Sequence, residues 1–256
     1  MAAAPGSERL QKLLSQLGLA SRREAEGWIR EGRLTVNGRP ALLGMRVVTG
    51  DQLKLDGRLI RQRMPKAASA AVFLCHRSPG EPLLPSRRGA PAATSASIAE
   101  RLPRSAGRRF VSISPMPMVD GGLELLSADG ALAARLQRAV HALEAEFSLR
   151  VRGELTPEQQ QAIGDGMLDR GDTLRVLRLE PSGGEASNRW YRLVAVGASG
   201  NDVRQLIERQ AVTLVRMLRT RLGTLELPRT LTRSHWRELT AEELRGLLGP
   251  AAARSR

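Results

Sequence analysis

A short stretch of small residues with a proline divides this chain of 256 residues into a basic head and a larger body. Residues 64–71 contain Pro65 and the alanine-rich run Ala67–Ala71, a composition typical of a linker. A chain well above about 200 residues usually holds more than one domain. We therefore expect a first domain at 8–63, a linker at 64–71, a second domain at 72–249 and a tail at 250–256.

The head carries a disproportionate share of the positive charge. The chain has 40 Lys and Arg against 26 Asp and Glu, a net charge of +14. Residues 1–66, a quarter of the chain, hold 13 basic and 6 acidic residues and so account for half of the surplus. This balance predicts a nucleic-acid partner. A membrane surface is the competing interpretation, but neither terminus shows a basic amphipathic helix with a wide apolar face.

Several other classes of function are disfavoured. No apolar run approaches the roughly 18 residues that span a bilayer, and residues 1–7 lack the apolar stretch of a signal peptide, so we expect a cytoplasmic protein. Cys75 is the only cysteine, which excludes an internal disulfide. His76, His141 and His235 are too far apart in sequence to suggest metal ligands. We expect no metal, no other cofactor and no membrane, and the sequence carries no signal for an oligomeric state.

The sequence of the head predicts two short helices packed on a small sheet. Leucines at helical spacing within residues 8–17 predict the first helix. Ser21 and Glu24 form a capping box that opens the second helix. Asn37 and Gly38 are the strongest short signal for a hairpin turn, and strand patterns lie on both sides of them.

Residues 8–60 resemble the alpha-L RNA-binding domain first named from a small-subunit ribosomal protein. The resemblance lies in an ordered set of segments: Arg9–Lys12, Gly18–Ala25, Ile29, Gly32-Arg33, Val36–Gly38 and Gly50-Asp51. It implies that the start of the second helix and the hairpin present a positive surface to structured RNA. The residues expected at that surface are Arg9, Lys12, Arg22, Arg23, Arg33, Asn37 and Arg39. The alternative for Arg22 and Arg23 is a solvated helix face without a ligand.

The body predicts a mixed α+β domain, because its strand and helix patterns alternate without a regular β-α-β rhythm. Strand patterns lie at 72–75, 147–151 and 190–196, helical patterns at 131–143 and 201–210, and a long loop is expected at 78–96.

Several ordered segments of the body resemble the ribosomal RNA pseudouridine synthases that carry an alpha-L domain at the N-terminus. These segments are 98–103, 122–130, 146–153, 203–206, 227–229 and 236–240. The resemblance implies a central, largely antiparallel sheet and an enzyme that isomerises a uridine in RNA. In that chemistry the uridine is flipped out and stacked on an aromatic ring, and a carboxylate held by an arginine acts as nucleophile or base.

The segment that should carry this carboxylate departs from the family. There an aspartate lies in a Gly-Arg-Leu-Asp segment shortly before a glycine and leucine run. Ungapped alignment on Gly122 places Ser114–Pro117 over that segment, so Pro117 occupies the aspartate position. Asp120 lies three residues later, up to about 10 Å away if the loop is extended, and we expect Glu124 to be exposed on a strand.

Two other pocket positions are retained in part. Phe147 lies where the family usually has a tyrosine, so it can stack on a base but cannot transfer a proton. Arg204 matches the arginine expected to pair with the aspartate. The alternative for Arg204 is an ordinary surface arginine on a helix.

The sequence therefore suggests a catalytically degenerate pseudouridine synthase homologue that still binds structured RNA, with ribosomal RNA or a ribosome assembly intermediate as the expected partner. The first alternative is an active synthase that uses Asp120 as a relocated acid. The second is a scaffold protein whose body binds another protein and whose RNA contact is incidental.

Overall fold

The computed structural model describes residues 7–48, 50–60, 71–85, 96–106, 109–169, 171–184 and 187–249. Its described residues group into two compact units, one formed by the head together with part of the segment 104–109, the other by the rest of the body. Each unit has its own hydrophobic core. Of the expected linker at 64–71, only Ala71 lies within the described residues, and the expected tail at 250–256 lies outside them.

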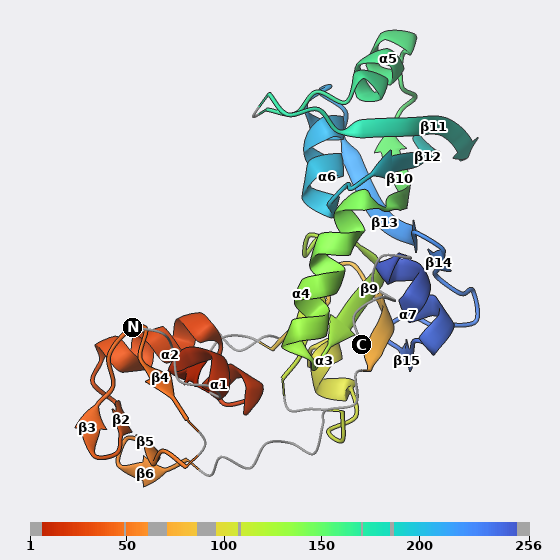
Figure 1. Cartoon of the computed structure of the whole chain (residues 1–256). Coiled ribbons are helices and arrows are strands. Elements are labelled where there is room, and N and C mark those ends of the chain that lie inside the picture. Colours follow the sequence, from red (N-terminus) through yellow and green to blue (C-terminus); the bar gives the residue numbers. More distant parts are fainter. Residues whose placement is uncertain are drawn as a thin grey trace. The chain divides into compact units, whose positions relative to one another are not determined.

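The head contains the two helices and the small sheet that the sequence predicts (Figure 1). Its helices are α1 (Leu10–Gln16) and α2 (Arg22–Arg30), and its strands are β1 (Glu8–Arg9), β2 (Leu34–Val36), β3 (Arg39–Pro40), β4 (Arg46–Val47), β5 (Leu53–Leu55) and β6 (Arg58–Leu59). Four strands form a sheet in the order β3-β2-β5-β6, and β1 pairs with β4. The first helix begins later than expected, because Glu8 and Arg9 pair with Val47 and Arg46 as a strand.

The local signals in the head act as expected. Ser21 Oγ accepts a hydrogen bond from the Glu24 amide at 3.0 Å, and the Glu24 carboxylate accepts one from the Ser21 amide at 3.2 Å, so the capping box is complete. Asn37 and Gly38 both have positive φ, 52° and 81°, as a tight hairpin turn requires. The capping box and the turn fix where the helix begins and where β2 turns into β3.

The body is built on one nine-stranded sheet with the path β11-β12-β10-β13-β9-β7-β15, to which β14 and β8 are added at β13 and β9. The strands are β7 (Val72–Arg77), β8 (Val111–Ile113), β9 (Gly121–Ser127), β10 (Glu144–Arg152), β11 (Arg175–Gly183), β12 (Asn188–Val196), β13 (Leu214–Leu222), β14 (Leu225–Glu226) and β15 (Trp236–Glu238). Only the β13–β9 pairing is parallel among the described strands. The predicted largely antiparallel sheet in an α+β fold is therefore confirmed.

Helices pack along this sheet, and their caps explain where they begin. They are α3 (Ile98–Arg101), α4 (Gly130–Ala139), α5 (Pro157–Asp165), α6 (Gly200–Glu208) and α7 (Ala241–Leu248), with a 3-10 turn at Val140–Ala142. Figure 1 shows α4 running beside β9 and α6 beside the β10–β13 region. Capping boxes open α5 at Thr156, α6 at Ser199 and α7 at Thr240.

The centre of the sheet is covered on both faces. Every residue of β9 is buried, including the charged Glu124. Of the expected loop at 78–96, residues 78–85 are described and contain no helix or strand, while 86–95 lie outside the described residues. No helix in the described ranges is both long enough and apolar enough to cross a membrane.

Candidate functional site

Asp120 and Arg204 are separated by 84 positions in sequence but form a two-point ion pair in the body. Arg204 Nε donates to Asp120 Oδ2 at 2.9 Å, and Arg204 Nη2 donates to Asp120 Oδ1 at 2.7 Å. The Met217 amide adds a third hydrogen bond to Oδ1 at 3.1 Å. Asp120 has no exposed surface, so these three donors occupy its carboxylate within the protein.

Arg204 reaches this carboxylate from α6. Its side chain is 20% exposed, and Nη1 also donates to Glu208 Oε1 at 2.6 Å. The hydrogen bonding of Arg204 to the Asp120 carboxylate, which accepts, is the main cause that raises the pKa of Arg204. The alternative of an ordinary surface arginine is therefore wrong, because Arg204 is anchored to a buried acid.

The loop before β9 brings Asp120 to this position by turning back. Ser114 has a φ of 51°, and the Asp120 amide donates to the Pro117 carbonyl at 3.1 Å, which closes a turn through Met118 and Val119. An extended loop, in which Asp120 would lie up to about 10 Å from Pro117, is therefore not what the structure contains. The prolines restrict their own φ values, but the turn lies after Pro117, where neither ring acts.

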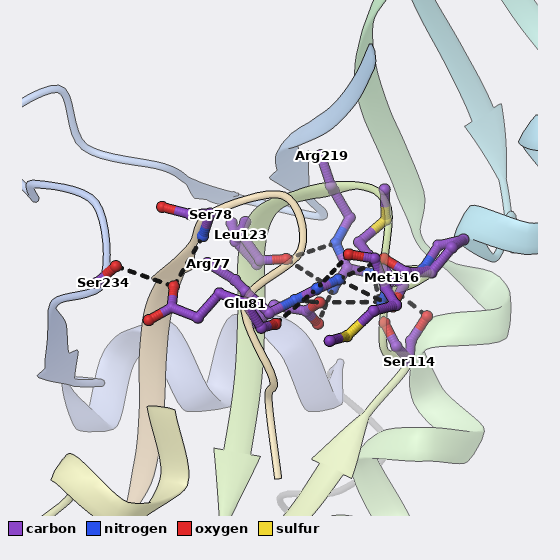
Figure 2. Close-up of polar contacts among 11 residues, drawn as sticks. Arg77, Ser78, Glu81, Ser114, Met116, Leu123, Arg219 and Ser234 are labelled. Atoms are coloured by element: carbon purple, nitrogen blue, oxygen red, sulfur yellow. Dashed lines mark hydrogen bonds and ion pairs between the residues drawn. The ribbon is translucent and has the colours of Figure 1, made fainter. Parts of the chain in front are cut away.

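A buried charge cluster lies under this loop (Figure 2). Arg77 on β7 donates from Nε to Glu124 Oε1 at 2.9 Å, and Arg219 on β13 donates from Nη2 to Oε2 at 3.4 Å. Glu124 has no exposed surface, so the expectation of a solvent-facing Glu124 is wrong. The reason is topological, because β9 lies between β7 and β13 in the middle of the sheet. Burial raises the pKa of Glu124 and lowers the pKa of Arg219, while their opposite charges counteract both shifts.

The two buried arginines also hold the loop by its main chain. Arg77 donates to the carbonyls of Met116 at 3.0 Å, Pro117 at 2.7 Å and Met118 at 3.3 Å. Arg219 Nη1 donates to the Ser114 carbonyl at 2.8 Å, and the Met116 amide donates to Glu124 Oε1 at 3.0 Å. Figure 2 shows these bonds converging on the loop from β7 and β13. We call residues 114–118, which these contacts hold in place, the clamped loop.

The clamped loop lies against the first turn of α6. A Cβ added at Gly200 would lie 2.6 Å from Pro117 Cδ and 2.7 Å from Met116 Sδ. Phe147 on β10 is fully buried. The expected aromatic ring is therefore part of the core and has no free face on which a base could stack in this conformation.

A hollow of about 440 Å³ lies over α6 beside the ion pair. Its lining residues are Asp169, Asn201, Asp202, Arg204, Gln205, Glu208 and Arg209. Its arginines are already engaged, since Arg209 donates to Asp169 at 2.9 Å and Arg204 to Glu208. Gln205 also donates to Asp169. Three carboxylates and two paired arginines make this hollow a poor site for phosphate.

The basic residues expected to contact RNA fall into two groups in the head. Arg9, Arg22, Arg23 and Arg39 are exposed, and within the described residues they form no ion pair. Lys12 is exposed but pairs with Glu8 at 2.6 Å.

Arg33 and Asn37 have partners within the head. Arg33 donates to both oxygens of Asp56 at 2.8 and 2.7 Å and lies over the Trp28 ring, and these hydrogen bonds raise its pKa. The Asn37 side chain donates to Asp51 at 2.8 Å and accepts from the Gln52 amide at 2.7 Å.

Arg77 and Arg219 were not predicted as functional residues. Their signal is an arginine at a strand position where the alternation calls for an apolar side chain, as in the run Leu214–Leu222. In the part of the chain that the structure describes, no group of three or more His, Cys, Asp or Glu could hold a metal ion.

Known proteins resemble both units. The family model described as S4 domain matches residues 8–53. A Pseudomonas aeruginosa protein named ribosomal large subunit pseudouridine synthase B is 35% identical over 242 residues, which cover 94% of this chain and 61% of that protein. Proteins of the same name from Salmonella typhimurium and Escherichia coli K12 are 32% and 33% identical, with 84% and 79% of their lengths covered.

The fold has a solved counterpart. A crystal structure of a pseudouridylate synthase superimposes with a TM-score of 0.58 at 18% identity, covering 93% of this chain and 99% of that one. This likeness supports the α+β architecture of the sheet and its helices. The chain spans about three fifths of the length of the Pseudomonas relative, and more of the other two.

Proposed function

Because the chain belongs to the family of ribosomal large subunit pseudouridine synthases B, we propose that it binds structured ribosomal RNA, or a ribosome assembly intermediate, without isomerising it. The head docks on the RNA, and the body keeps the pocket of the fold in a closed form. Its place of action under this proposal is the cytoplasm, with the ribosome.

The observation that carries the non-catalytic part is the environment of Asp120. A carboxylate that attacks a nucleoside, or removes its proton, must present an oxygen about 3 Å from the reacting atom. Asp120 is fully buried and accepts three hydrogen bonds from Arg204 and Met217. The clamped loop packs against α6, and Phe147 is enclosed in the core. Asp120 thus acts as the counter-ion of Arg204.

RNA binding is supported by the head. It matches the S4 domain, and its exposed Arg9, Arg22, Arg23 and Arg39 have no acidic partner within the described residues. Cations that are not neutralised within the protein are free to displace the counterions of phosphate groups. Lys12 can join them if RNA displaces Glu8.

Pseudouridine mapping tests the proposal. The purified full chain is incubated with an unmodified transcript of large-subunit ribosomal RNA, and each uridine is then assayed for conversion. We expect binding of the transcript and no new pseudouridine. A pseudouridine that depends on the protein overturns the non-catalytic proposal, and a chain that fails to bind the transcript overturns the RNA-binding proposal.

One observation favours a second candidate, an active synthase that uses Asp120. The chemistry requires a carboxylate paired with an arginine, and Asp120 forms such a pair with Arg204. Asp120 lies three positions after Pro117. In this case the clamped loop has to move and expose the carboxylate. Asp120→Asn should then abolish conversion and leave RNA affinity unchanged. Glu208→Gln is the matched control, because it removes the charge of the other acid paired with Arg204.

A further inference from the structure

The outer part of the body sheet has a polar face that is distinct from the pocket face. Along β10 the side chains alternate, with Phe147, Leu149 and Val151 buried and Ser148 and Arg150 on the opposite face. Phe147 is directly opposite Arg219, which holds the clamped loop, so the second face lies on the side of the sheet away from that loop.

One row of this face contains an aromatic ring followed by two arginines. Arg150 is directly opposite Trp190 on β12 and directly opposite Arg216 on β13. The Arg150 guanidinium lies 5.9 Å from the centre of the Trp190 ring. Residues that face each other in an antiparallel pair have Cβ atoms about 5 Å apart, so the three side chains are neighbours. We call Trp190, Arg150 and Arg216 the sheet row.

The charges in this row are not compensated within the described protein. Like charges directly opposite each other destabilise a sheet. Two other arginines of the outer strands do have carboxylate partners: Arg178 pairs with Glu180 at 3.4 Å, and Arg192 with Glu146 at 3.9 Å. Neither Arg150 nor Arg216 forms an ion pair with any described residue.

A second observation also indicates a missing partner. Arg150 Nε is buried and has no hydrogen-bond partner among the described residues. Leaving a buried donor unsatisfied costs free energy, more so when the group is charged. An anion on the sheet row would relieve the repulsion between Arg150 and Arg216 and provide acceptors for their unmade hydrogen bonds.

We propose that the sheet row is a second RNA-binding surface, on which Arg150 and Arg216 contact phosphates and Trp190 stacks on an unpaired base. An aromatic ring beside arginines fits single-stranded RNA, because bases stack on the ring while the fork-shaped guanidinium groups bind phosphate. An acidic peptide would use the arginines but not the flat face of the ring. The inference rests on RNA being the partner under the proposed function, and adds a site away from the head and the pocket.

The test measures how RNA affinity depends on salt in the full-length protein. The probes are poly(U) and the large-subunit ribosomal RNA transcript, and the comparison ligand is poly-L-glutamate. The test variant is Arg150→Gln with Arg216→Gln. The control is Arg138→Gln with Arg245→Gln, which also removes two charges but from exposed helix positions whose guanidinium groups bond only to the backbone one turn away.

We expect the test variant to have a shallower dependence of log affinity on log salt, by about 1.4 for two single-strand phosphate contacts, whereas the control keeps the wild-type slope. A slope in the test variant equal to that of the control overturns this inference. The inference is also overturned if the wild-type protein binds poly-L-glutamate more tightly than poly(U) and the test variant loses this binding. If the wild-type protein binds neither RNA, the proposed function fails together with the inference.

A measurement on the unmodified protein guards against a misfolded variant. RNA that contains 4-thiouridine is cross-linked to the wild-type chain, and the attached peptides are identified by mass spectrometry. We expect cross-links in β10, β12 and β13 in addition to the head. Cross-links confined to the head overturn the sheet-row inference while leaving the proposed function in place.

Discussion

Asp120 and Arg204 meet through two hydrogen bonds of 2.7 and 2.9 Å, although 84 positions separate them in the sequence. The pair lies where α6 approaches the start of β9, and Asp120 is the fully buried partner. Arg204 supplies two of the three donors to this carboxylate, and the Met217 amide supplies the third. The same contact anchors Arg204 of α6 to the start of β9.

We expect Asp120 and Arg204 to be energetically coupled. In a double-mutant cycle with Asp120→Asn and Arg204→Gln, the coupling in the free energy of unfolding should be about 1–3 kcal/mol, because charged hydrogen bonds to a buried acid are lost. Urea unfolding measures it. The matched cycle of Glu208→Gln with Arg204→Gln involves an acid that is 51% exposed and should give less than about 1 kcal/mol. Equal coupling in the two cycles would contradict a structural role for Asp120.

Replacing Glu124 should strongly destabilise the body. Glu124→Gln leaves the buried Arg77 and Arg219 without their counter-charge, and breaking a buried ion pair in this way costs about 3–5 kcal/mol. The control Glu180→Gln removes the acid of an exposed pair and should change the free energy of unfolding by less than about 1 kcal/mol. The urea midpoints of the two variants are compared. Similar small losses of unfolding free energy in both would show that the cluster does not hold the loop.

Two glycine substitutions probe the packing of the clamped loop. Gly200→Ala places a Cβ 2.6 Å from the Pro117 ring, so we expect a loss of about 1–3 kcal/mol from overpacking and faster hydrogen exchange of the Met116 amide, which donates to Glu124. Gly164→Ala on α5 meets no atom within 4 Å and should stabilise the protein by about 0.5–1 kcal/mol. Unchanged exchange in the loop of Gly200→Ala would refute the contact.

Salt dependence separates an RNA-binding head from a scaffold with incidental RNA contact. We expect RNA affinity to fall steeply with salt, and Arg22→Ala with Arg23→Ala to make the slope shallower by about 1.4–1.8. Arg58→Ala with Arg46→Ala is a control of equal charge at other exposed positions of the head. A flat salt dependence of the wild-type protein favours the scaffold.

Acid should weaken the stabilisation that the ion pair of Glu243 with Arg237 gives to α7. Arg237 donates to both of its oxygens, at 2.6 and 2.9 Å, and these bonds lower the pKa of Glu243 to about 2. The unfolded chain therefore takes up the proton first as the pH falls. The stabilisation is fully present above about pH 5 and is lost as the pH falls from about 4.5 through 2.

The difference in urea midpoint between wild type and Glu243→Gln should therefore be constant near neutral pH and vanish near pH 2. Glu242→Gln, on the same turn of α7, is the control. A difference that persists at pH 2 would contradict the assignment to the Arg237 pair.

Local sequence signals predicted much of the fold, because each acts over a few residues. The Ser21 capping box and the Asn37-Gly38 turn have the expected geometry, and the strand patterns near Phe147 and Trp190 lie in β10 and β12. The family resemblance of the whole chain is also confirmed.

The pocket was predicted less well, because its contacts join residues far apart in sequence. Whether Asp120 reaches Arg204 depends on the turn after Pro117, and that turn depends on Arg77, some 40 positions earlier. The burial of Glu124 depends on the strand order, which residue spacing alone does not give. The family resemblance predicted Arg33 and Asn37 at the RNA surface. Residue spacing did not predict their partners, because Asp56 follows β5 and Asp51 precedes it.

The bonds from Arg77 to the clamped loop end on carbonyl groups, which every amino acid carries. These hydrogen bonds therefore do not depend on which side chains the loop carries. A substitution at Pro117 would therefore leave in place the acceptor to which Arg77 donates. The hold of Arg77 on this part of the chain does not depend on which side chain position 117 carries.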